Sequence, residues 1–191
     1  MKHVFFFALP MLLLSACTSR PSAETNRVGT AIDSTLTTAP ATLSAAPPPT
    51  SARLSSLSLL PDFDWKRVKL GDALSAAKAG ETERPFEEDA SHVGYSVEFD
   101  NLESVDYQYF SESGKVSGIR VDLYLNNPPS VHAYQQDLVA YYTARYGRPQ
   151  QSANVYAWPG PMAGGIVTLK DVSRAKEHGL VLKIGKVPAA R

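Results

Sequence analysis

Residues 105–125 read VDYQYFSESGKVSGIRVDLYL, and this stretch decides the fold class. Apolar side chains occupy every second position from Ile119 to Leu125, and the same spacing runs from Val105 to Tyr109. Because successive strand residues point to opposite faces of a sheet, this alternation indicates strands with one buried and one solvated face. With a turn at Ser113-Gly114-Lys115, the stretch predicts a two-faced antiparallel hairpin.

The rest of the folded region contains two helical patterns and four more strand patterns. They are a helix over 73–79, a strand over 95–99, a helix over 127–147 and strands over 155–158, 166–172 and 180–184. Asp72 is the expected cap of the short helix, and Gly147 is the expected end of the long one. The order αβββαβββ predicts an α+β fold, an antiparallel sheet carrying two helices on one face.

Each half of this order is a helix followed by three strands, so an internal duplication is one interpretation, although identity between the halves is negligible. The tandem helix-plus-sheet plan is similar to that of β-lactamase-inhibitor-like proteins, which bind other proteins. The stretch Val68-Lys69-Leu70-Gly71-Asp72-Ala73-Leu74 resembles the helix entry in small outer-membrane assembly lipoproteins of the SmpA/OmlA type. Fold analogy alone does not establish a function.

The N-terminal residues have the pattern of an export signal. A cationic start is followed by an apolar run from Val4 to Leu14, which is too short to span a bilayer, and then by small residues. Leu14-Ser15-Ala16-Cys17 resembles the lipobox of bacterial lipoproteins. The resemblance implies cleavage after Ala16, a diacylglyceryl group on Cys17 and further acylation by fatty acids such as palmitate. Thr18, which is not Asp, implies transport to the outer membrane.

Residues 18–60 have the composition of a disordered tether. None of them is aromatic, and 28 of the 43 are Ser, Thr, Ala or Pro. Such a segment buries too little apolar surface to offset the entropy of ordering. We therefore expect a signal peptide over 1–16, a lipidated tether over 17–60 and a single periplasmic domain over 61–191. Four leucines at the end of the tether are candidates for contact with the domain, namely Leu54, Leu57, Leu59 and Leu60.

Composition and motifs exclude several functional classes. Nineteen basic residues balance nineteen acidic ones, which gives no support for nucleic-acid binding, and the one Cys excludes a disulfide framework. No Gly-X-Ser-X-Gly elbow occurs, and His92, His132 and His178 lack metal-ligand spacing. Glu87-Glu88-Asp89 lacks the calcium-loop pattern. We expect no catalytic residues, no metal and no cofactor, although a site of dispersed carboxylates stays open.

Two features are candidates for partner contact. Pro159-Gly160-Pro161-Met162-Ala163-Gly164-Gly165 lacks the Lys-Ser/Thr of a phosphate loop and is read as a loop tip between strands, so Trp158, Pro159, Gly160, Pro161 and Met162 are the predicted contact residues. Residues 81–106 hold nine acids against one base, whereas residues 115–191 hold ten Lys and Arg against four acids. These lobes either neutralise each other or form a surface that steers a partner.

The leading functional hypothesis is a lipid-anchored, periplasm-facing protein-binding module of the outer membrane without catalytic activity. An envelope accessory and an immunity or inhibitor protein are both compatible with it. The first alternative is a peptidoglycan-binding lipoprotein, in which an exposed Trp65 or Trp158 stacks on a sugar ring. The second is a cell-envelope hydrolase whose active site is assembled from dispersed residues.

Overall fold

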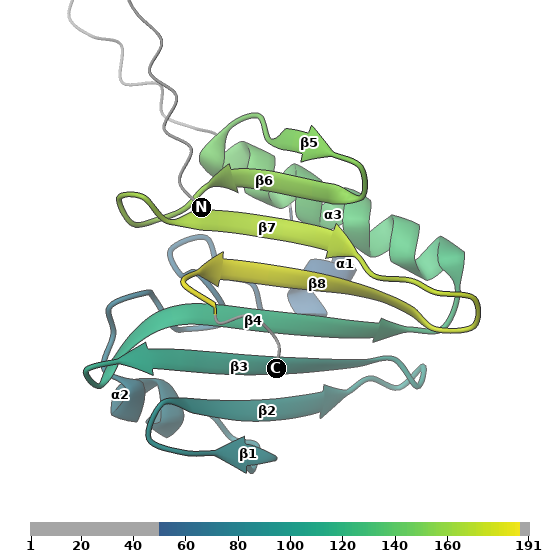
Figure 1. Cartoon of the computed structure of the whole chain (residues 1–191). Coiled ribbons are helices and arrows are strands. Elements are labelled where there is room, and N and C mark those ends of the chain that lie inside the picture. The colour runs from purple at the N-terminus through teal and green to yellow at the C-terminus, as the bar shows by residue number, and fades with distance from the viewer. Residues whose placement is uncertain (1–49, 188–191) are drawn as a thin grey trace, which may run out of the picture. The chain divides into compact units, whose positions relative to one another are not determined.

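The computed structural model describes residues 50–187, so the predicted signal peptide, Cys17 and residues 18–49 lie outside the described residues. The described part forms an eight-stranded antiparallel sheet with helices packed against it (Figure 1). In chain order the elements are α1 (Ala52–Ser56), α2 (Leu74–Ala79), β1 (Glu87–Glu88), β2 (His92–Glu98), β3 (Ser104–Glu112), β4 (Lys115–Leu125), α3 (Pro128–Tyr146), β5 (Gln150–Ser152), β6 (Val155–Pro159), β7 (Ile166–Asp171) and β8 (His178–Gly185). The predicted α+β class with an antiparallel sheet is confirmed.

The sheet consists of two four-stranded meanders joined side by side. Its strand order is β1-β2-β3-β4-β8-β7-β6-β5, so the last strand of each meander meets the other in the centre. There Val121 pairs with Leu182 and Leu123 with Leu180. Each meander follows a helix, α2 or α3, and begins with a very short strand, β1 or β5. The expected order lacked β1, β5 and the first helix, α1.

The hairpin of β3 and β4 has the alternation that its sequence predicts. Tyr107, Tyr109, Ile119 and Val121 are each at most 1% exposed and share one face. Tyr107 lies opposite Val121 and Tyr109 opposite Ile119, so the buried residues of the two strands are in register. Side chains at the intervening positions are only partly buried, and the hairpin therefore has a core face and a solvent-facing face.

Helix α3 begins and ends at the signals in its sequence. The side-chain oxygen of Asn127 accepts a hydrogen bond from the Ser130 amide at 2.9 Å, and two prolines occupy the first turn. Gly147 ends the helix at φ +83°, a conformation that favours glycine. The short helix α2 differs from expectation because its N-cap is Ala73. Asp72 instead accepts a hydrogen bond from the Lys69 amide at 2.8 Å.

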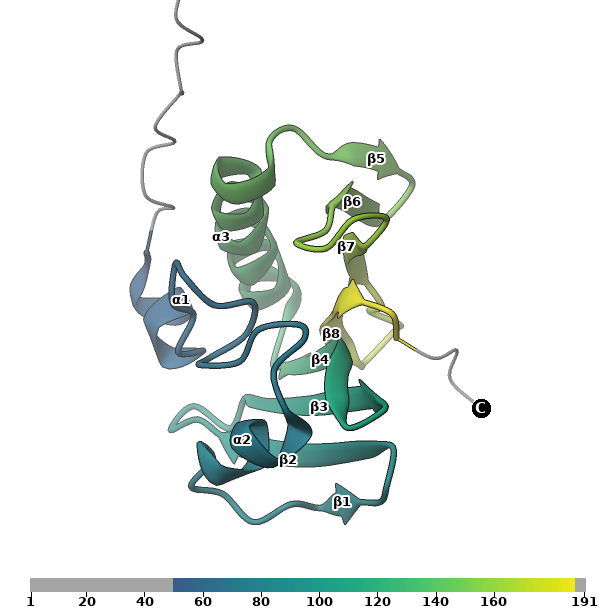
Figure 2. The ribbon, with the colours of Figure 1, turned by 90° about the vertical axis from the view of Figure 1, so that its left-hand side faces the viewer.

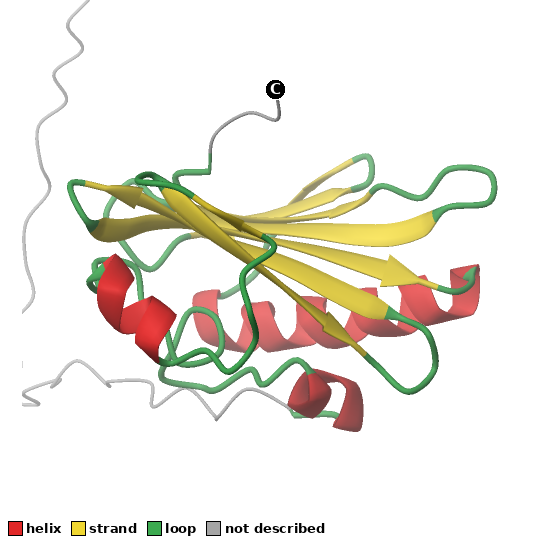
Figure 3. Cartoon of the chain, turned by 90° about the horizontal axis from the view of Figure 1, so that it is seen from below, coloured by secondary structure: helices red, strands yellow, loops and turns green. Residues whose placement is uncertain are grey.

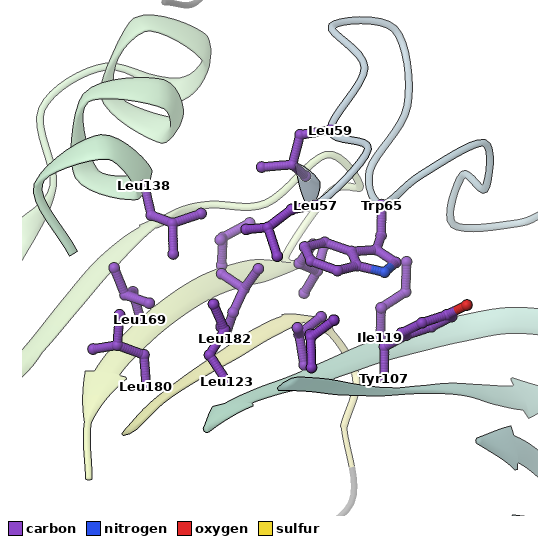
Figure 4. Close-up of a cluster of buried hydrophobic side chains, with 14 of the residues drawn as sticks. Leu57, Leu59, Trp65, Tyr107, Ile119, Leu123, Leu138, Leu169, Leu180 and Leu182 are labelled. Atoms are coloured by element: carbon purple, nitrogen blue, oxygen red, sulfur yellow. The ribbon is translucent and has the colours of Figure 1, made fainter. Parts of the chain in front are cut away.

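The helices of residues 50–187 lie on one side of the sheet, and within this part of the chain the opposite face carries no helix (Figures 2 and 3). The core is the layer between them. Leu57, Leu59 and Trp65 point from the N-terminal segment toward Ile119, and Leu138 of α3 lies over the other half of the sheet (Figure 4). The five residues are between 0% and 4% exposed.

The folded domain begins before residue 61, which corrects the expected boundary at residue 60. Leu54, Leu57 and Leu59 are at most 4% exposed, so residues assigned to the tether are part of the core. Ser51 and Arg53 also donate hydrogen bonds to Asp137 of α3, at 2.6 and 2.9 Å. The apolar surface that these leucines bury offsets the entropy of ordering the segment.

Candidate functional site

The loop between β6 and β7 is closed on itself and presents apolar side chains to solvent. The Gly160 amide donates to the Gly165 carbonyl and the Gly165 amide to the Met162 carbonyl, both at 2.8 Å. Met162 is 51% exposed and Ile166, the first residue of β7, is 49% exposed. Large apolar side chains that remain half exposed are candidates for contact with a partner.

A cavity of about 220 Å³ separates this loop from the β3–β4 turn. We call it the loop cavity. Its lining is mostly apolar or glycine, with three charged side chains, and consists of Leu70, Gly71, Glu112, Lys115, Val116, Ser117, Met162, Ala163, Gly164, Gly165, Gly185 and Lys186. The Lys186 ammonium lies 3.2 Å from the Glu112 carboxylate, and both side chains are largely exposed.

Gly185 is required where the wall of the loop cavity is tightest. Its φ of +74° favours glycine, and a Cβ there would lie 2.6 Å from Leu70 Cδ1 and 2.7 Å from the Ser117 carbonyl oxygen. The close approach lets the Lys186 amide donate to that same carbonyl at 2.9 Å. The cavity is thus bounded by backbone on this side.

The structure corrects the role of Trp158. Its side chain is 1% exposed and stacks between Tyr142 and Tyr156, with ring centroids 5.7 and 6.2 Å away, so it belongs to the core. Pro159, Gly160 and Pro161 lie at the start of the loop. Met162 is the predicted contact residue that lines the cavity.

The peptidoglycan alternative required an exposed indole. Trp65 is 1% exposed, as is Trp158, so neither tryptophan can stack on a sugar ring in this conformation. Trp65 instead packs beside Tyr107, with ring centroids 6.1 Å apart. Neither tryptophan is therefore exposed in the way that the peptidoglycan alternative requires.

A second and larger cavity, of about 710 Å³, lies between the N-terminal segment and α2. We call it the entry cavity, because Thr50, the first described residue, lies on its rim. Its lining residues are Thr50, Ser55, Ser58, Leu59, Leu60, Pro61, Lys66, Arg67, Val68, Ala76, Ala77, Gly80, Glu81 and Thr82. Its size falls within the range of about 300–1,000 Å³ that ligand pockets occupy.

A buried polar network forms part of the wall of the entry cavity. The Glu81 carboxylate accepts hydrogen bonds from Tyr107 at 2.6 Å, from Tyr109 at 2.7 Å and from Lys66 at 2.8 Å. Its side chain is only 4% exposed. Burial, reinforced by the negative charge of Glu81, raises the pKa of both tyrosines well above 10. Both phenols therefore stay neutral and act as donors.

The sequence counted Glu81 among the nine acids of residues 81–106 and did not single out Lys66. The two are 15 residues apart and meet only because α2 packs over β3. The sequence feature that could have pointed to a buried acceptor such as Glu81 was the position of Tyr107 and Tyr109 on the buried face of a strand. A buried phenol needs a hydrogen-bond partner, and a carboxylate is a strong one.

The three histidines do not converge, because His92 lies apart from the other two, which share one cavity. His92 lies 2.9 Å from Asp89 and 3.1 Å from Glu87. His132 and His178 line a cavity of about 270 Å³ beside Asp171 and Arg174. Among residues 50–187, no group of three or more His, Cys, Asp or Glu side chains is arranged to hold a metal ion.

The acidic and basic lobes meet on the face of the sheet that carries no helix. Asp106 on β3 lies directly opposite Asp122 on β4, and Arg120 bonds the Asp122 carboxylate with two donors at 2.7 and 2.8 Å. Lys183 of β8 lies opposite Arg120. Arg120 and Asp122 both belong to residues 115–191, so this ion pair lies within the basic lobe and does not neutralise the acidic one.

Comparison of the chain with models of known protein families, with curated proteins and with solved structures found no match. None of the helices within residues 50–187 is both long and apolar enough to cross a membrane. The loop cavity and the entry cavity are therefore assessed on their own geometry.

Proposed function

We propose that the protein is a lipid-anchored, periplasm-facing protein-binding module of the bacterial outer membrane, and that it acts without catalysis. In this proposal Cys17 carries the acyl groups and residues 18–49 link it to the domain. The observation that carries the binding role is the loop cavity, a largely apolar hollow lined in part by the half-exposed Met162.

The size of the loop cavity suits one large apolar side chain of a partner. At about 220 Å³ it is smaller than the pockets of about 300 Å³ and more that hold small molecules. Fully burying a Leu, Phe or Met side chain contributes about 1.5–3 kcal/mol. A few such anchors, seated in pockets at the centre of an interface, dominate most protein–protein affinities.

The charges around the loop cavity favour an acidic flank on the partner. The charged side chains in the described lining are two cations, Lys115 and Lys186, and one carboxylate, Glu112, so the cavity carries a net positive charge. Rim charges of this kind raise the association rate and set orientation more than they add affinity. We therefore propose a partner segment with a large apolar side chain next to an acidic residue.

Photocrosslinking in intact cells tests the binding role. A benzoylphenylalanine replaces Met162 in the loop, and a second one replaces Leu102, which is 91% exposed in the β2–β3 turn, as the control. We expect a discrete adduct with a cell-envelope protein from position 162 and none from position 102. Equal or absent adducts from the two positions would overturn the proposal.

Two further measurements separate the pocket from the anchor. Met162→Lys places a charge at the mouth of the loop cavity. We expect that the partner identified by crosslinking no longer copurifies with this variant, and that the variant stays in the membrane fraction. Cys17→Ala is expected to move the protein from the membrane fraction to the soluble periplasmic fraction. Retention of the Cys17→Ala variant in membranes would contradict lipid anchoring.

A further inference from the structure

The entry cavity has a floor made of aliphatic side chains. Leu59, Leu60, Val68, Ala76 and Ala77 all line it. Leu60, although large and apolar, is 37% exposed. Within residues 50–187 no aromatic side chain lines the cavity, so this part of the wall offers contact for an alkyl chain and no ring on which a base or sugar could stack.

One side of the entry cavity carries positive charge. Lys66 and Arg67 both line it, and among the described lining residues Glu81 is the only acidic one. Lys66 is held by Glu81 at 2.8 Å and by the Tyr107 hydroxyl at 2.7 Å. The Arg67 side chain is exposed and forms no hydrogen bond or ion pair within residues 50–187. The net charge of the lining is therefore positive, and its uncommitted cation is Arg67.

The buried network around Glu81 leaves the positive charge of Arg67 available to a ligand. Glu81 accepts three hydrogen bonds and is neutralised by Lys66, so its carboxylate is not directed at the cavity as a free anion. Such an arrangement is preorganised, because the polar groups of the wall already have their partners before anything binds. An anionic group near Arg67 would gain a partner without displacing Glu81.

We propose that the entry cavity binds an amphiphile with a single aliphatic chain and an acidic head group. The chain lies over Leu59, Val68 and Ala76, and the head group lies at Arg67. The volume of about 710 Å³ and the aliphatic part of the lining favour the chain, and the Arg67 guanidinium, which has no partner within residues 50–187, favours the acid. This site is distinct from the loop cavity and does not require acylation of Cys17.

Calorimetric titration with dodecanoate below its micellar concentration tests the proposal. The protein is the mature chain from residue 17, purified with Cys17→Ser so that no attached acyl group competes. We expect saturable binding at one site for dodecanoate and none for acetate, which lacks the chain. Dodecyltrimethylammonium, which has the same chain and a cationic head, should bind at least tenfold more weakly.

Two pairs of variants locate the site. Ala76→Phe fills the cavity and should weaken dodecanoate binding at least tenfold, whereas Ala79→Phe, on the same helix but outside the lining, should not. Arg67→Gln should weaken binding about fivefold or more, and Arg84→Gln, also exposed, should leave it unchanged. Urea unfolding of each variant checks that the fold is retained.

Three results would overturn the proposal. One is equal binding of the anionic and cationic probes, which would indicate unselective detergent adsorption. Another is unchanged binding by Ala76→Phe. The last is absence of saturable dodecanoate binding by the mature chain from residue 17. None of these outcomes depends on crosslinking at Met162, so the two proposals fail separately.

Discussion

The Lys66 ammonium lies 2.8 Å from Glu81 Oε2 in a pair that is largely withdrawn from solvent. The same carboxylate accepts hydrogen bonds from two tyrosines of β3. Removing one member of a buried charge pair leaves the other without compensation, which costs more than the loss of a surface salt bridge. Together with these two tyrosines, the pair therefore connects the segment that follows α2 to strand β3.

Glu81→Gln should destabilise the domain. The amide removes the charge that balances Lys66, and its NH₂ group faces a donor where a carboxylate oxygen had accepted. We expect the free energy of unfolding to fall by about 2–4 kcal/mol. Urea denaturation measures the loss, and Glu83→Gln, at an exposed position, is the control, expected to change it by less than about 0.5 kcal/mol. Similar losses for both variants would contradict a special role for Glu81.

Stability should fall steeply above pH 10. Burial raises the pKa of Tyr146 from 10.0 to about 12, against the opposing effect of Arg145. Between these values the unfolded chain loses the phenol proton and the folded chain keeps it, so the free energy of unfolding falls as pH rises from 10 to 12. Below pH 10 this residue contributes no pH dependence.

Unfolding free energies of the wild type and of Tyr146→Phe, measured in urea at pH 9 and pH 11, test this expectation. The variant lacks the titrating phenol and should lose less stability over the interval. A remaining loss is expected from Tyr107 and Tyr109, whose pKa values are also raised. An identical decrease in the two proteins would show that Tyr146 does not titrate in this window.

Local patterns predicted most of the sheet and the long helix. The alternation from Ile119 to Leu125 and the glycine at position 147 each depend on residues of one element. Both can therefore be recognised in the sequence without knowledge of distant contacts. Helix α1 was missed because Leu54 and its neighbouring leucines stand among Ser and Ala, where composition favours disorder. Strands β1 and β5 have two and three exposed residues, too few for any alternation.

The candidate sites were harder to predict, because their residues come from distant segments. Leu70, Val116 and Gly185 each read as ordinary core or turn residues and form the loop cavity only after the sheet is assembled. Trp158 was placed correctly at the end of a predicted strand, but it was wrongly proposed as a contact residue because it directly precedes the loop over 159–165. Its position on β6, two residues from Tyr156, places it instead on the buried face of the strand.

The pKa of Asp89 should depend on the hydroxyl of Ser91. Hydrogen bonds from the Ser91 amide at 2.6 Å and from its hydroxyl at 2.8 Å, with a further one from the His92 amide, lower the pKa of Asp89 from 3.8 to about 2. Ser91→Ala removes the hydroxyl and keeps the amide, so the pKa should rise part of the way toward 3.8. Carboxyl carbon NMR across pH 1.5–6 measures it.

Ser96→Ala, at an exposed position of the adjacent strand β2, is the matched control and should leave the titration of Asp89 unchanged. The sign for stability follows from the lowered value. The contribution of Asp89 is present above pH 3.8 and is lost as pH falls through about 2. A Ser91→Ala variant with an unshifted Asp89 titration would show that the backbone amides alone set the pKa.

Leu182→Ala should be among the most damaging substitutions in the domain. Leu182 is 0% exposed on β8 and lies between Val121 of β4 and Leu169 of β7, where the two meanders join. Truncation leaves a cavity at that junction, so we expect the free energy of unfolding to fall by about 2–5 kcal/mol.

Leu102→Ala provides the comparison, because the same atoms are removed from a side chain that is 91% exposed. Its effect should stay within about 0.5 kcal/mol. If each meander were stable alone, Leu182→Ala would split the urea transition into two steps instead of shifting it. A single shifted transition, followed by both tryptophan fluorescence and circular dichroism, is the result expected of one core shared by both halves.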